Sequence, residues 1–541
     1  MQHQQNRSKP SPPTSAPIRR LLSRKQFLKW VGFSGMGFIL SNWLADGKTV
    51  ASQSNAQLTF DVKQTSHQMS GFGGQIWMDD EAVALDIAKD QKWSMVRVNI
   101  QDKKPAVKNQ KKKDRDKLNL PLSNIKNVDF KTHWDSLDAG EMKEFHRQLE
   151  TRRIIPIYAF LKDEPRWLDS NNKFISNYIN EVAEYWAAHV GWMKKNGVSP
   201  KYIELFNEPD YKTGGIVSPK DYNEIVKAVR KKLDERGYKD TLIVGPGTAH
   251  FDLKPNDPNY IEALDPDGVN AIGAWSVHSY EWGWEGLTDP KWDINSPKYV
   301  RNHWKDDQGL LKSINSKDPN HSKPIFLTEH ATKSKKYYGG QYDSNDQDEK
   351  TNFASKTQSY GVHVFGNALT FINNHVNGVI LFQAQDQGWD KTHWGMMSEN
   401  KFKRPVYYTM QTLSSAVPPG AMVLKSPLQD ESDIYAAAFI AGDRFIAAFA
   451  NGTQTERAVT VTVNNANISF LKAEAVVNGK IVKGKVGRTP NSPSFIVTLP
   501  SDSTLVVTFQ SSTQTNGNPQ KKPLPAKGEP SKPSSPIRGM W

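Results

Sequence analysis

Between residues 71 and 385, short apolar runs alternate with longer amphipathic stretches. The runs are rich in β-branched and aromatic residues, as in IIPIYAF, IELF and GVILF. Nearly continuous apolar runs of this length are typical of parallel strands that are buried on both faces of a sheet. The pattern predicts eight strands, at residues 71–77, 95–101, 154–160, 202–206, 241–245, 274–280, 324–329 and 378–384.

The stretches between these runs have the periodicity of helices. Residues 177–196 carry apolar side chains at spacings of three and four residues, and the pattern ends before Gly197. Ser218 followed by Pro219 is a helix start signal, with a capping hydroxyl and a proline at the first helical position. This alternation favours an α/β fold, a closed (β/α)₈ TIM barrel. No G-x-G-x-x-G follows the first strand, so a nucleotide-binding open sheet lacks its signature.

After residue 414 the pattern changes to short strands separated by turn residues. Gly442-Asp443 and Asn478-Gly479 are two-residue hairpin signals between strand-like runs. We therefore expect a C-terminal antiparallel β-sandwich at residues 415–510, after a barrel domain at 57–414. Residues 58–62 are a candidate edge strand of this sandwich. Its other predicted strands are residues 434–441, 445–450, 458–463, 475–477, 480–482 and 505–509.

The two ends of the chain have the composition of segments outside a folded core. In residues 1–56 a basic run, SRKQFLK, precedes a short apolar stretch at 31–40, which is the layout of a signal peptide. The run is similar to the twin-arginine export motif, with Lys25 at the position of the second arginine. We expect export to the periplasm or beyond the cell, without stable membrane insertion after cleavage; an uncleaved membrane anchor is the alternative. Residues 511–541 are rich in Pro, Ser and Lys and are expected to be a disordered tail.

Charge and composition exclude several function classes. The formal net charge is +13, but residues 1–50 carry +7 and residues 511–541 carry +4. The body is nearly neutral, so nucleic acid is not an expected partner. The chain contains no cysteine, which excludes disulfides, thiolate nucleophiles and Cys-ligated zinc. The histidines are scattered and no His-Glu-x-x-His is present, so we expect no metal and no cofactor.

Two carboxylates follow predicted strands of the barrel. Glu208 lies in IELFNEPD after the fourth strand, and Glu329 ends the seventh strand in PIFLTEH. Active sites of such barrels lie at the C-terminal ends of the strands. Burial and neighbouring groups there can tune the pKa of a carboxyl group for acid–base work.

This arrangement resembles the clan A retaining glycoside hydrolases, which carry an Asn-Glu-Pro acid/base after strand four and a nucleophilic Glu after strand seven. The opening Gly71-Phe72-Gly73-Gly74 and the appended sandwich resemble family 30, whereas Phe-Asn-Glu-Pro-Asp is closer to family 39. The resemblance implies a double-displacement enzyme that cleaves β-glycosidic bonds of an oligo- or polysaccharide. We expect the protein to be a monomer. A catalytically inactive carbohydrate-binding barrel is the alternative, and the intact pair of glutamates speaks for the enzyme.

The resemblance also implies roles for individual residues. Glu208 would be the acid/base and Glu329 the nucleophile. The substrate-binding candidates are Asn207 toward the sugar 2-hydroxyl, Arg97 and Tyr280 beside Glu329, His278, and Trp389 as a sugar platform. Structural alternatives are an ion pair for Arg97, a core histidine for His278 and simple packing for Trp389.

A basic run directly follows the second predicted strand. Residues 103–117 contain eight Lys or Arg and two Asp. The run is either a solvated loop or a clamp for an anionic sugar substrate, because loops after barrel strands emerge on the catalytic face.

Overall fold

The computed structural model describes residues 56–77, 81–100, 139–160, 173–211, 216–251, 257–280, 296–331, 356–386, 394–426, 434–488 and 492–513. The chain divides into two compact units, Met1–Ser52 and Gln53–Trp541, and all described residues belong to the second. The predictions for residues 1–55 of the signal segment, the basic run 103–117, Trp389 and residues 514–541 of the tail fall outside the described residues. Residue 56 and residues 511–513, which the sequence assigns to the signal segment and the tail, lie instead in strands.

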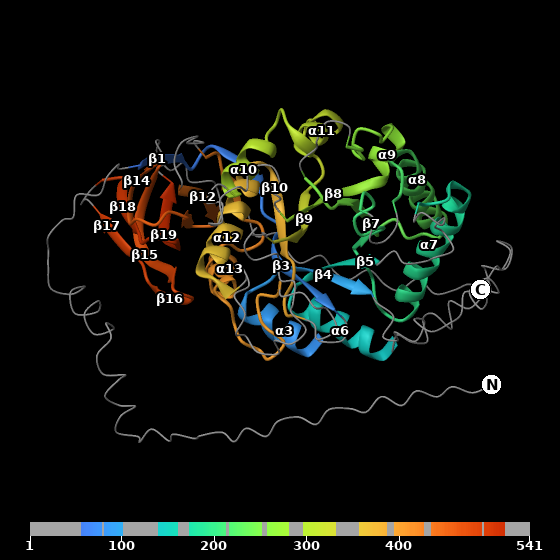
Figure 1. The fold of residues 1–541 in the computed structure, drawn as a ribbon, viewed down its shortest axis with the longest axis horizontal. Helices are drawn as coiled ribbons and strands as arrows, with labels where there is room; N and C mark the ends of the chain where they lie inside the picture. Colours follow the sequence, from blue (N-terminus) through green and yellow to red (C-terminus); the bar gives the residue numbers. More distant parts are fainter. Residues whose placement is uncertain are drawn as a thin grey trace, which may run out of the picture. The chain divides into compact units, whose positions relative to one another are not determined.

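All eight predicted barrel strands are confirmed, and they close into a parallel barrel (Figure 1). Neighbouring pairs keep a parallel register around the ring. In barrel order from the first strand, they are β3 (Gly71–Trp77), β4 (Met95–Ile100), β5 (Ile155–Phe160), β6 (Tyr202–Glu204), β7 (Leu242–Thr248), β8 (Ile272–Ser279), β9 (Ile325–His330) and β10 (Val376–Leu381).

Two glycines account for local features of the barrel strands. Gly73 allows β3 and β4 to approach closely, and Gly245 lies where β7 runs beyond its predicted end. A side chain at Gly73 would place its Cβ 1.9 Å from the carbonyl oxygen of Met95, so β3 needs glycine to pair this closely with β4. Strand β7 continues to Thr248, beyond the predicted end at Gly245, because Gly245 and Pro246 still pair with β8. The sequence GPG reads as a turn, but in the barrel its backbone is part of the sheet.

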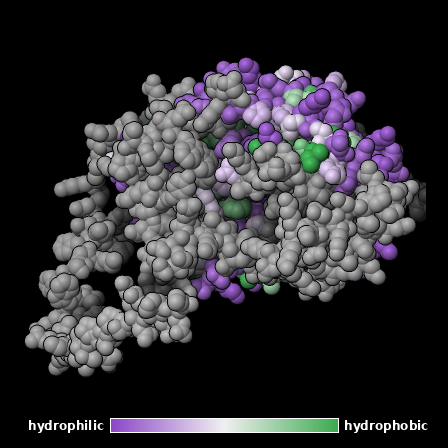
Figure 2. Space-filling view, turned by 45° about the vertical axis from the view of Figure 1, so that its right-hand side comes forward, coloured by the Kyte–Doolittle hydropathy of each residue, from purple (hydrophilic) through white to green (hydrophobic). Residues whose placement is uncertain are grey.

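Helices surround the barrel, and their outer surface is mainly hydrophilic where described residues are visible in Figure 2. The predicted cap of α8 is confirmed, since the Ser218 hydroxyl accepts a hydrogen bond of 3.1 Å from the Asp221 amide. No helix of the described part is both long and apolar enough to cross a bilayer. The helices are α3 (Glu81–Asp90), α6 (Ala139–Thr151), α7 (Ile179–Lys195), α8 (Pro219–Glu235), α9 (Pro266–Ala271), α10 (Ser296–His303), α11 (Gly309–Lys317), α12 (Gln358–Asn373) and α13 (Pro405–Ala416), with a short 3₁₀ turn, η6 (Ser176–Tyr178).

The C-terminal strands form two sheets, and both predicted hairpins are confirmed. One sheet has the order β1-β14-β18-β17, and the other has the order β16-β15-β19-β13-β12-β11-β2. Residues 56–68 lie before the barrel in sequence but pair with these sheets, β1 beside β14 and β2 beside β11. The strands are β1 (Ala56–Asp61), β2 (Thr65–Gln68), β11 (Met422–Leu424), β12 (Ile434–Ala441), β13 (Arg444–Asn451), β14 (Arg457–Asn464), β15 (Ala466–Val477), β16 (Lys480–Lys483), β17 (Lys485–Arg488), β18 (Ser494–Leu499) and β19 (Ser503–Thr513).

Strand β13 shows how the sandwich is fixed to the barrel. Phe445 and Phe449 point into the core between the two sheets, whereas Ile446 and Ala448 join the core of the barrel helices. Successive side chains of a strand face opposite sides, so an entirely apolar strand can serve two cores. The barrel and the sandwich therefore share one continuous apolar contact through the seven-stranded sheet.

Inside the barrel, the lower part of the lumen is filled by apolar side chains, one from each of seven strands. Residues two positions further along the strands share the same face and form a polar layer above it. This layer includes Arg97, Glu204, Ser276 and Thr328, all fully buried. The apolar layer thus supports a dry polar floor at the C-terminal ends of the strands; its members are Met95, Ile157, Tyr202, Val244, Ala274, Phe326 and Ile380.

Candidate active site

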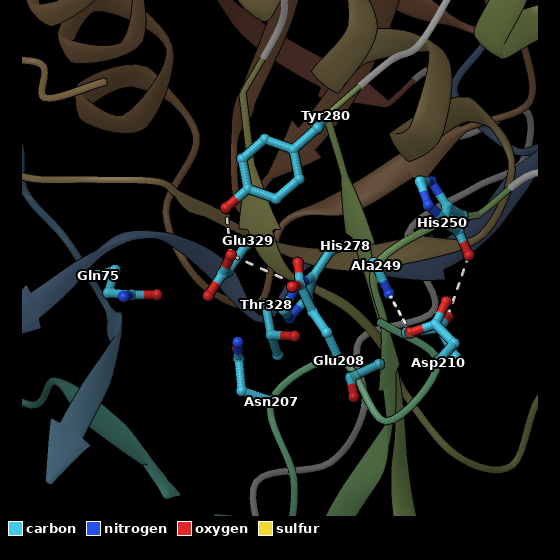
Figure 3. Close-up of polar contacts among 12 residues, drawn as sticks. Gln75, Asn207, Glu208, Asp210, Ala249, His250, His278, Tyr280, Thr328 and Glu329 are labelled. Carbon is cyan, nitrogen blue, oxygen red and sulfur yellow. Dashed lines mark hydrogen bonds and ion pairs between the residues drawn. The ribbon is translucent and has the colours of Figure 1, made fainter. Parts of the chain in front are cut away.

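The barrel brings the two predicted carboxylates together at its C-terminal end (Figure 3). Glu208 follows β6, Glu329 lies in β9, and His278 lies in β8 between them. His278 Nδ1 is 3.1 Å from Glu208 Oε1 and 3.4 Å from Glu329 Oε2. One atom from each of the three side chains lies within 4.8 Å of the others. The carboxyl groups are therefore too close to admit a water between them in the manner of inverting glycosidases, which need roughly 6.5–9.5 Å.

Arg97 on β4 holds the floor of this site. Its Nε donates to Glu204 at 2.6 Å, and its Nη1 donates to Glu329 and, at 2.7 Å, to Gln75. Its Nη2 donates to Asn207 Oδ1 at 2.7 Å. Burial by itself lowers the pKa of Arg97, but the charges of Glu204 and Glu329 raise it above its usual value. The guanidinium stays charged and fixes the position of Glu329 and Asn207.

Glu204 is a member of this network that the sequence did not single out. It lies at the end of β6, fully buried, four residues before Glu208. Besides Arg97, it accepts hydrogen bonds from Ser276 at 3.1 Å and Thr328 at 2.8 Å. The signal available in the sequence was an acidic residue within an apolar strand, because a buried carboxylate requires partners.

Tyr280, just beyond the end of β8, donates its hydroxyl proton to Glu329 Oε2, and Figure 3 shows the ring directed at that carboxylate. Burial and the neighbouring charge of Glu329 raise the pKa of Tyr280 well above 10, so the phenol stays protonated. The ring packs edge-on against Phe382 and Trp394, with centroids 5.7 and 5.5 Å away. These two aromatic residues beside the site were not predicted, whereas the predicted Trp389 lies outside the described residues.

His278 is completely buried between the two carboxylates. Burial lowers the pKa of its imidazole, but Glu329 and Glu208 outweigh burial and raise the pKa above its usual value. Among the described residues, its Nε2 has no hydrogen-bond partner. His278 therefore lies in contact with both predicted catalytic residues, and its role remains a prediction.

The backbone of Glu208 adopts a left-handed conformation, with φ of +50°. Its amide donates to the Gly247 carbonyl at 3.0 Å, and its own carbonyl accepts from the Tyr211 amide at 3.0 Å. Asp210 is anchored beside it by the Ala249 amide at 2.8 Å, and burial raises the pKa of Asp210. The loop after β6 thus holds the Glu208 side chain toward His278 at a cost in backbone energy.

Glu208, His278 and Glu329 are also of the types that bind metal ions. However, Glu329 already accepts from Arg97 and Tyr280, and the raised pKa of His278 favours its protonated form. A metal ion would have to displace that proton and compete with the guanidinium. Among the described residues, the arrangement fits proton transfer and nucleophilic attack better than metal coordination.

No protein-family model and no curated protein sequence matches the chain. Solved structures do match. A family 30 endoxylanase from Clostridium papyrosolvens is 14% identical, with a TM-score of 0.59, covering 84% of this chain and 100% of that one. A glycoside hydrolase family 30 subfamily 8 xylanase from Clostridium acetobutylicum is 13% identical, with a TM-score of 0.58 and the same coverages.

A third structure comes from another family of glycosidases. A family 51 α-L-arabinofuranosidase from Bifidobacterium longum is 13% identical, with a TM-score of 0.56, covering 85% of this chain and 100% of that one. At such identities the likeness shows the fold: a (β/α)₈ barrel of the kind found in clan A glycosidases, together with β-sheets outside the barrel.

Proposed function

We propose that this protein is a retaining glycoside hydrolase that cleaves β-glycosidic bonds of an oligo- or polysaccharide. The observation that carries the proposal is the pair Glu208 and Glu329, close enough for double displacement and bridged by His278. Arg97 and Tyr280 both donate to Glu329, which suits a nucleophile, whereas Glu208 receives neither of these donors.

In the first step, a Glu329 oxygen attacks the anomeric carbon. Glu208 transfers its proton to the glycosidic oxygen, and the carbon–oxygen bond breaks with its electron pair moving to that oxygen. The leaving group departs as an alcohol, and the sugar remains bound to Glu329 as an ester. Glu208 is left as a carboxylate next to His278.

In the second step, the Glu208 carboxylate removes a proton from water, and the water oxygen attacks the anomeric carbon. The ester bond breaks, and its electron pair returns to Glu329. The hydrogen bonds from Arg97 and Tyr280 stabilise the carboxylate as it leaves. Two inversions at the anomeric carbon give overall retention of configuration.

The comparisons support the chemistry at the level of O-glycosidic bonds. The matched structures include proteins named as xylanases, an endo-β1,6-glucanase and an arabinofuranosidase, so their substrates differ. The basic run 103–117 keeps an anionic glycan as one candidate substrate. A hydrolysis screen with product sizing would identify the sugar, the linkage and the mode of cleavage.

The proposal is tested by product stereochemistry and two variants. Proton NMR during hydrolysis of an active substrate should show the β-anomer first. Glu329→Gln should abolish turnover, and Glu208→Ala should retain activity on aryl glycosides with good leaving groups and form a glycosyl azide when azide is added. A product of inverted configuration, or a fully active Glu329→Gln variant, would refute the assignment. Sugar binding without any turnover by the parent would support the inactive carbohydrate-binding alternative.

A further inference from the structure

A buried ion pair lies behind the aromatic residues that surround Tyr280. Asp386, which follows β10, accepts a hydrogen bond from Nη2 of Arg404, the residue that caps the N-terminal end of α13. Arg404 is fully buried and Asp386 is 4% exposed. Two opposite charges taken out of water return little net stability, because their attraction barely offsets the loss of hydration. The pair is therefore weak evidence of a stabilising role, and what it holds in place matters more.

Both members of the pair bond the main chain of Gly395. The Gly395 amide donates to Asp386 Oδ1 at 2.7 Å, and the Gly395 carbonyl oxygen accepts from Arg404 Nη1 at 2.6 Å. The space around Gly395 is filled, since a Cβ there would lie 2.5 Å from the Asp386 nitrogen and 2.5 Å from the carbonyl oxygen of Met397. The Asp386 amide donates to that same carbonyl oxygen at 2.9 Å. The backbone at Gly395 is thus held by both charges and by its packing.

Gly395 comes directly after Trp394, and Trp394 packs against the ring of Tyr280. These two rings meet edge-on, with centroids 5.5 Å apart. Phe382 completes the group, with its centroid 5.7 Å from that of Tyr280 and 6.4 Å from that of Trp394. Three rings in mutual edge contact restrict one another, so a fixed backbone beside Trp394 also restricts the ring of Tyr280.

The hydroxyl of Tyr280 donates to Glu329, and Figure 3 shows the ring directed at that carboxylate. Burial and the charge of Glu329 raise the pKa of Tyr280, so the phenol keeps the proton that it donates. A donor stabilises the carboxylate that leaves the anomeric carbon only if it is already in place when the charge develops. A displacement of about 1 Å in such a group can lower the rate by about 100-fold.

We propose that Asp386 and Arg404 are positioning residues of the proposed reaction. They act through the main chain beside Trp394 and keep the hydroxyl of Tyr280 directed at the predicted nucleophile. The proposal rests on the proposed function, because the aim of the phenol affects the rate only if that carboxylate reacts. It assigns no contact with substrate to either member of the ion pair.

A double-mutant cycle between Asp386→Asn and Tyr280→Phe tests this action. Tyr280→Phe removes the hydroxyl and should lower kcat by about 100-fold on the best aryl glycoside of the hydrolysis screen. Asp386→Asn removes the charge that pairs with Arg404 and should lower kcat by about 10-fold. If Asp386 acts through the phenol, the double variant should be no more than about twofold slower than Tyr280→Phe. Independent losses would instead multiply to about 1000-fold, and that result overturns the proposal.

A second variant keeps the proposal testable if Asp386→Asn does not fold. Gly395→Ala keeps both charges of the ion pair but displaces the backbone beside Trp394, because the space for a Cβ is filled. It should show a similar loss of kcat, again with no more than about a twofold additional loss in the Tyr280→Phe background.

Asp90→Asn is the control for disturbance of α13. Asp90 on α3 pairs at 2.7 Å with Lys403, the residue next to Arg404. The variant therefore removes an ion pair at the start of the same helix without removing a bond to Gly395. Its kcat should stay within about twofold of the parent, since an exposed pair of this kind contributes little. A loss as large as that of Asp386→Asn overturns the proposal.

A spectroscopic signature separates this proposal from the proposed function. In protein labelled with ¹³C at the ζ carbon of tyrosine, the Tyr280 signal is assigned by its absence from the spectrum of Tyr280→Phe. The chemical shift of this carbon depends on the hydrogen bond of the phenol, so Asp386→Asn and Gly395→Ala should move the signal and Asp90→Asn should not.

The two proposals then fail in different ways. If no glycoside is cleaved, the glycosidase proposal fails, and a moved Tyr280 signal still supports the positioning role. If substrates are cleaved with retention but Asp386→Asn and Gly395→Ala leave kcat unchanged, the positioning role fails alone. A Tyr280 signal that neither variant moves overturns the positioning role, whether or not a glycoside is cleaved.

Discussion

At the residue scale, the site depends on side chains held in costly positions. Glu208 is held at a φ that glycine adopts without penalty. Arg97 is fully buried and donates hydrogen bonds to two carboxylates and two amide side chains. Such costs persist when the surrounding contacts over-determine the conformation, as the bonds of Glu208 to Gly247 and Tyr211 do here. The chain therefore gives up stability to aim the carboxyl group of Glu208.

The cost at Glu208 can be measured with two variants that both remove the carboxyl group. A left-handed conformation costs a residue with a Cβ roughly 1–2 kcal/mol. We therefore expect Glu208→Gly to be more stable than Glu208→Ala by about 1 kcal/mol, which reverses the usual order of these two residues. Urea denaturation of both variants measures the difference. An alanine variant of equal or greater stability would show that the backbone at this position carries no strain.

At the scale of elements, Glu204 joins four strands that are distant in sequence. It lies on β6 and bonds Arg97 on β4, Ser276 on β8 and Thr328 on β9. The packing around it is tight, since a Cβ at Gly247 would come within 2.6 Å of Glu204 Oε1. Removal of the Glu204 charge leaves the buried Arg97 with Glu329 as its remaining acidic partner among the described residues, so the charges of the network are no longer balanced as before.

We expect Glu204→Gln to lower the free energy of unfolding by about 3–5 kcal/mol, because the buried Arg97 loses one of its two counter-charges and Ser276 and Thr328 lose a charged acceptor. Glu184→Gln is the matched control: Glu184 pairs with Arg236 and Lys232 near the surface, where an ion pair is worth about 1 kcal/mol or less. Chemical denaturation of both variants gives the comparison. Similar losses in the two variants would mean that the buried network contributes no more than a surface pair.

At the scale of the whole second unit, the barrel and the sandwich meet through β2 as well as through α12 and α13. His67 on β2 donates from Nε2 to the carbonyl oxygen of Val376 on β10 at 3.0 Å. Burial lowers the pKa of His67 to about 4, and the neighbouring His375 and His321 act in the same direction. The junction thus contains a histidine that folds in its neutral form.

The lowered pKa of His67 predicts that the free energy of unfolding decreases at acid pH by a definite amount. The unfolded state takes up a proton near pH 6.5 and the folded state near pH 4, so stability is lost as the pH falls through this window. Between pH 7 and pH 4, the free energy of unfolding of the parent should therefore fall by about 3 kcal/mol more than that of His67→Gln. The reason is that glutamine keeps a donor for Val376 and takes up no proton. Denaturation at several pH values measures the difference; a constant difference would contradict the neutral histidine.

The proposal that the protein is exported is tested on the intact chain. Replacement of Arg24 and Lys25 by Gln should leave the precursor in the cytoplasm if the twin-arginine route is used, because the basic pair is the recognition signal. Cell fractionation with immunoblotting against the C-terminal domain locates the protein. Normal export of this variant would point to the general secretory route.

The sequence by itself determined the eight barrel strands, both hairpins of the sandwich and the two candidate carboxylates. Each rests on a local property: strand periodicity, turn chemistry, or the position of an acidic residue where an apolar strand ends. The end of β7 was placed too early, because glycine and proline indicate a turn until a neighbouring strand is present to pair with them. These features need few contacts distant in sequence.

Only the tertiary structure decided the spacing of the carboxylates and the role of the residues around them. The bond from Arg97 to Glu329 joins residues 232 positions apart, and that from Trp77 to Gln383 joins residues 306 positions apart. Glu204 and Trp394 carry no motif, and they come next to the two carboxylates through closure of the barrel, which places the C-terminal ends of all eight strands around one lumen. Hydrogen bonding and burial are properties of that enclosed space, and no local pattern encodes them.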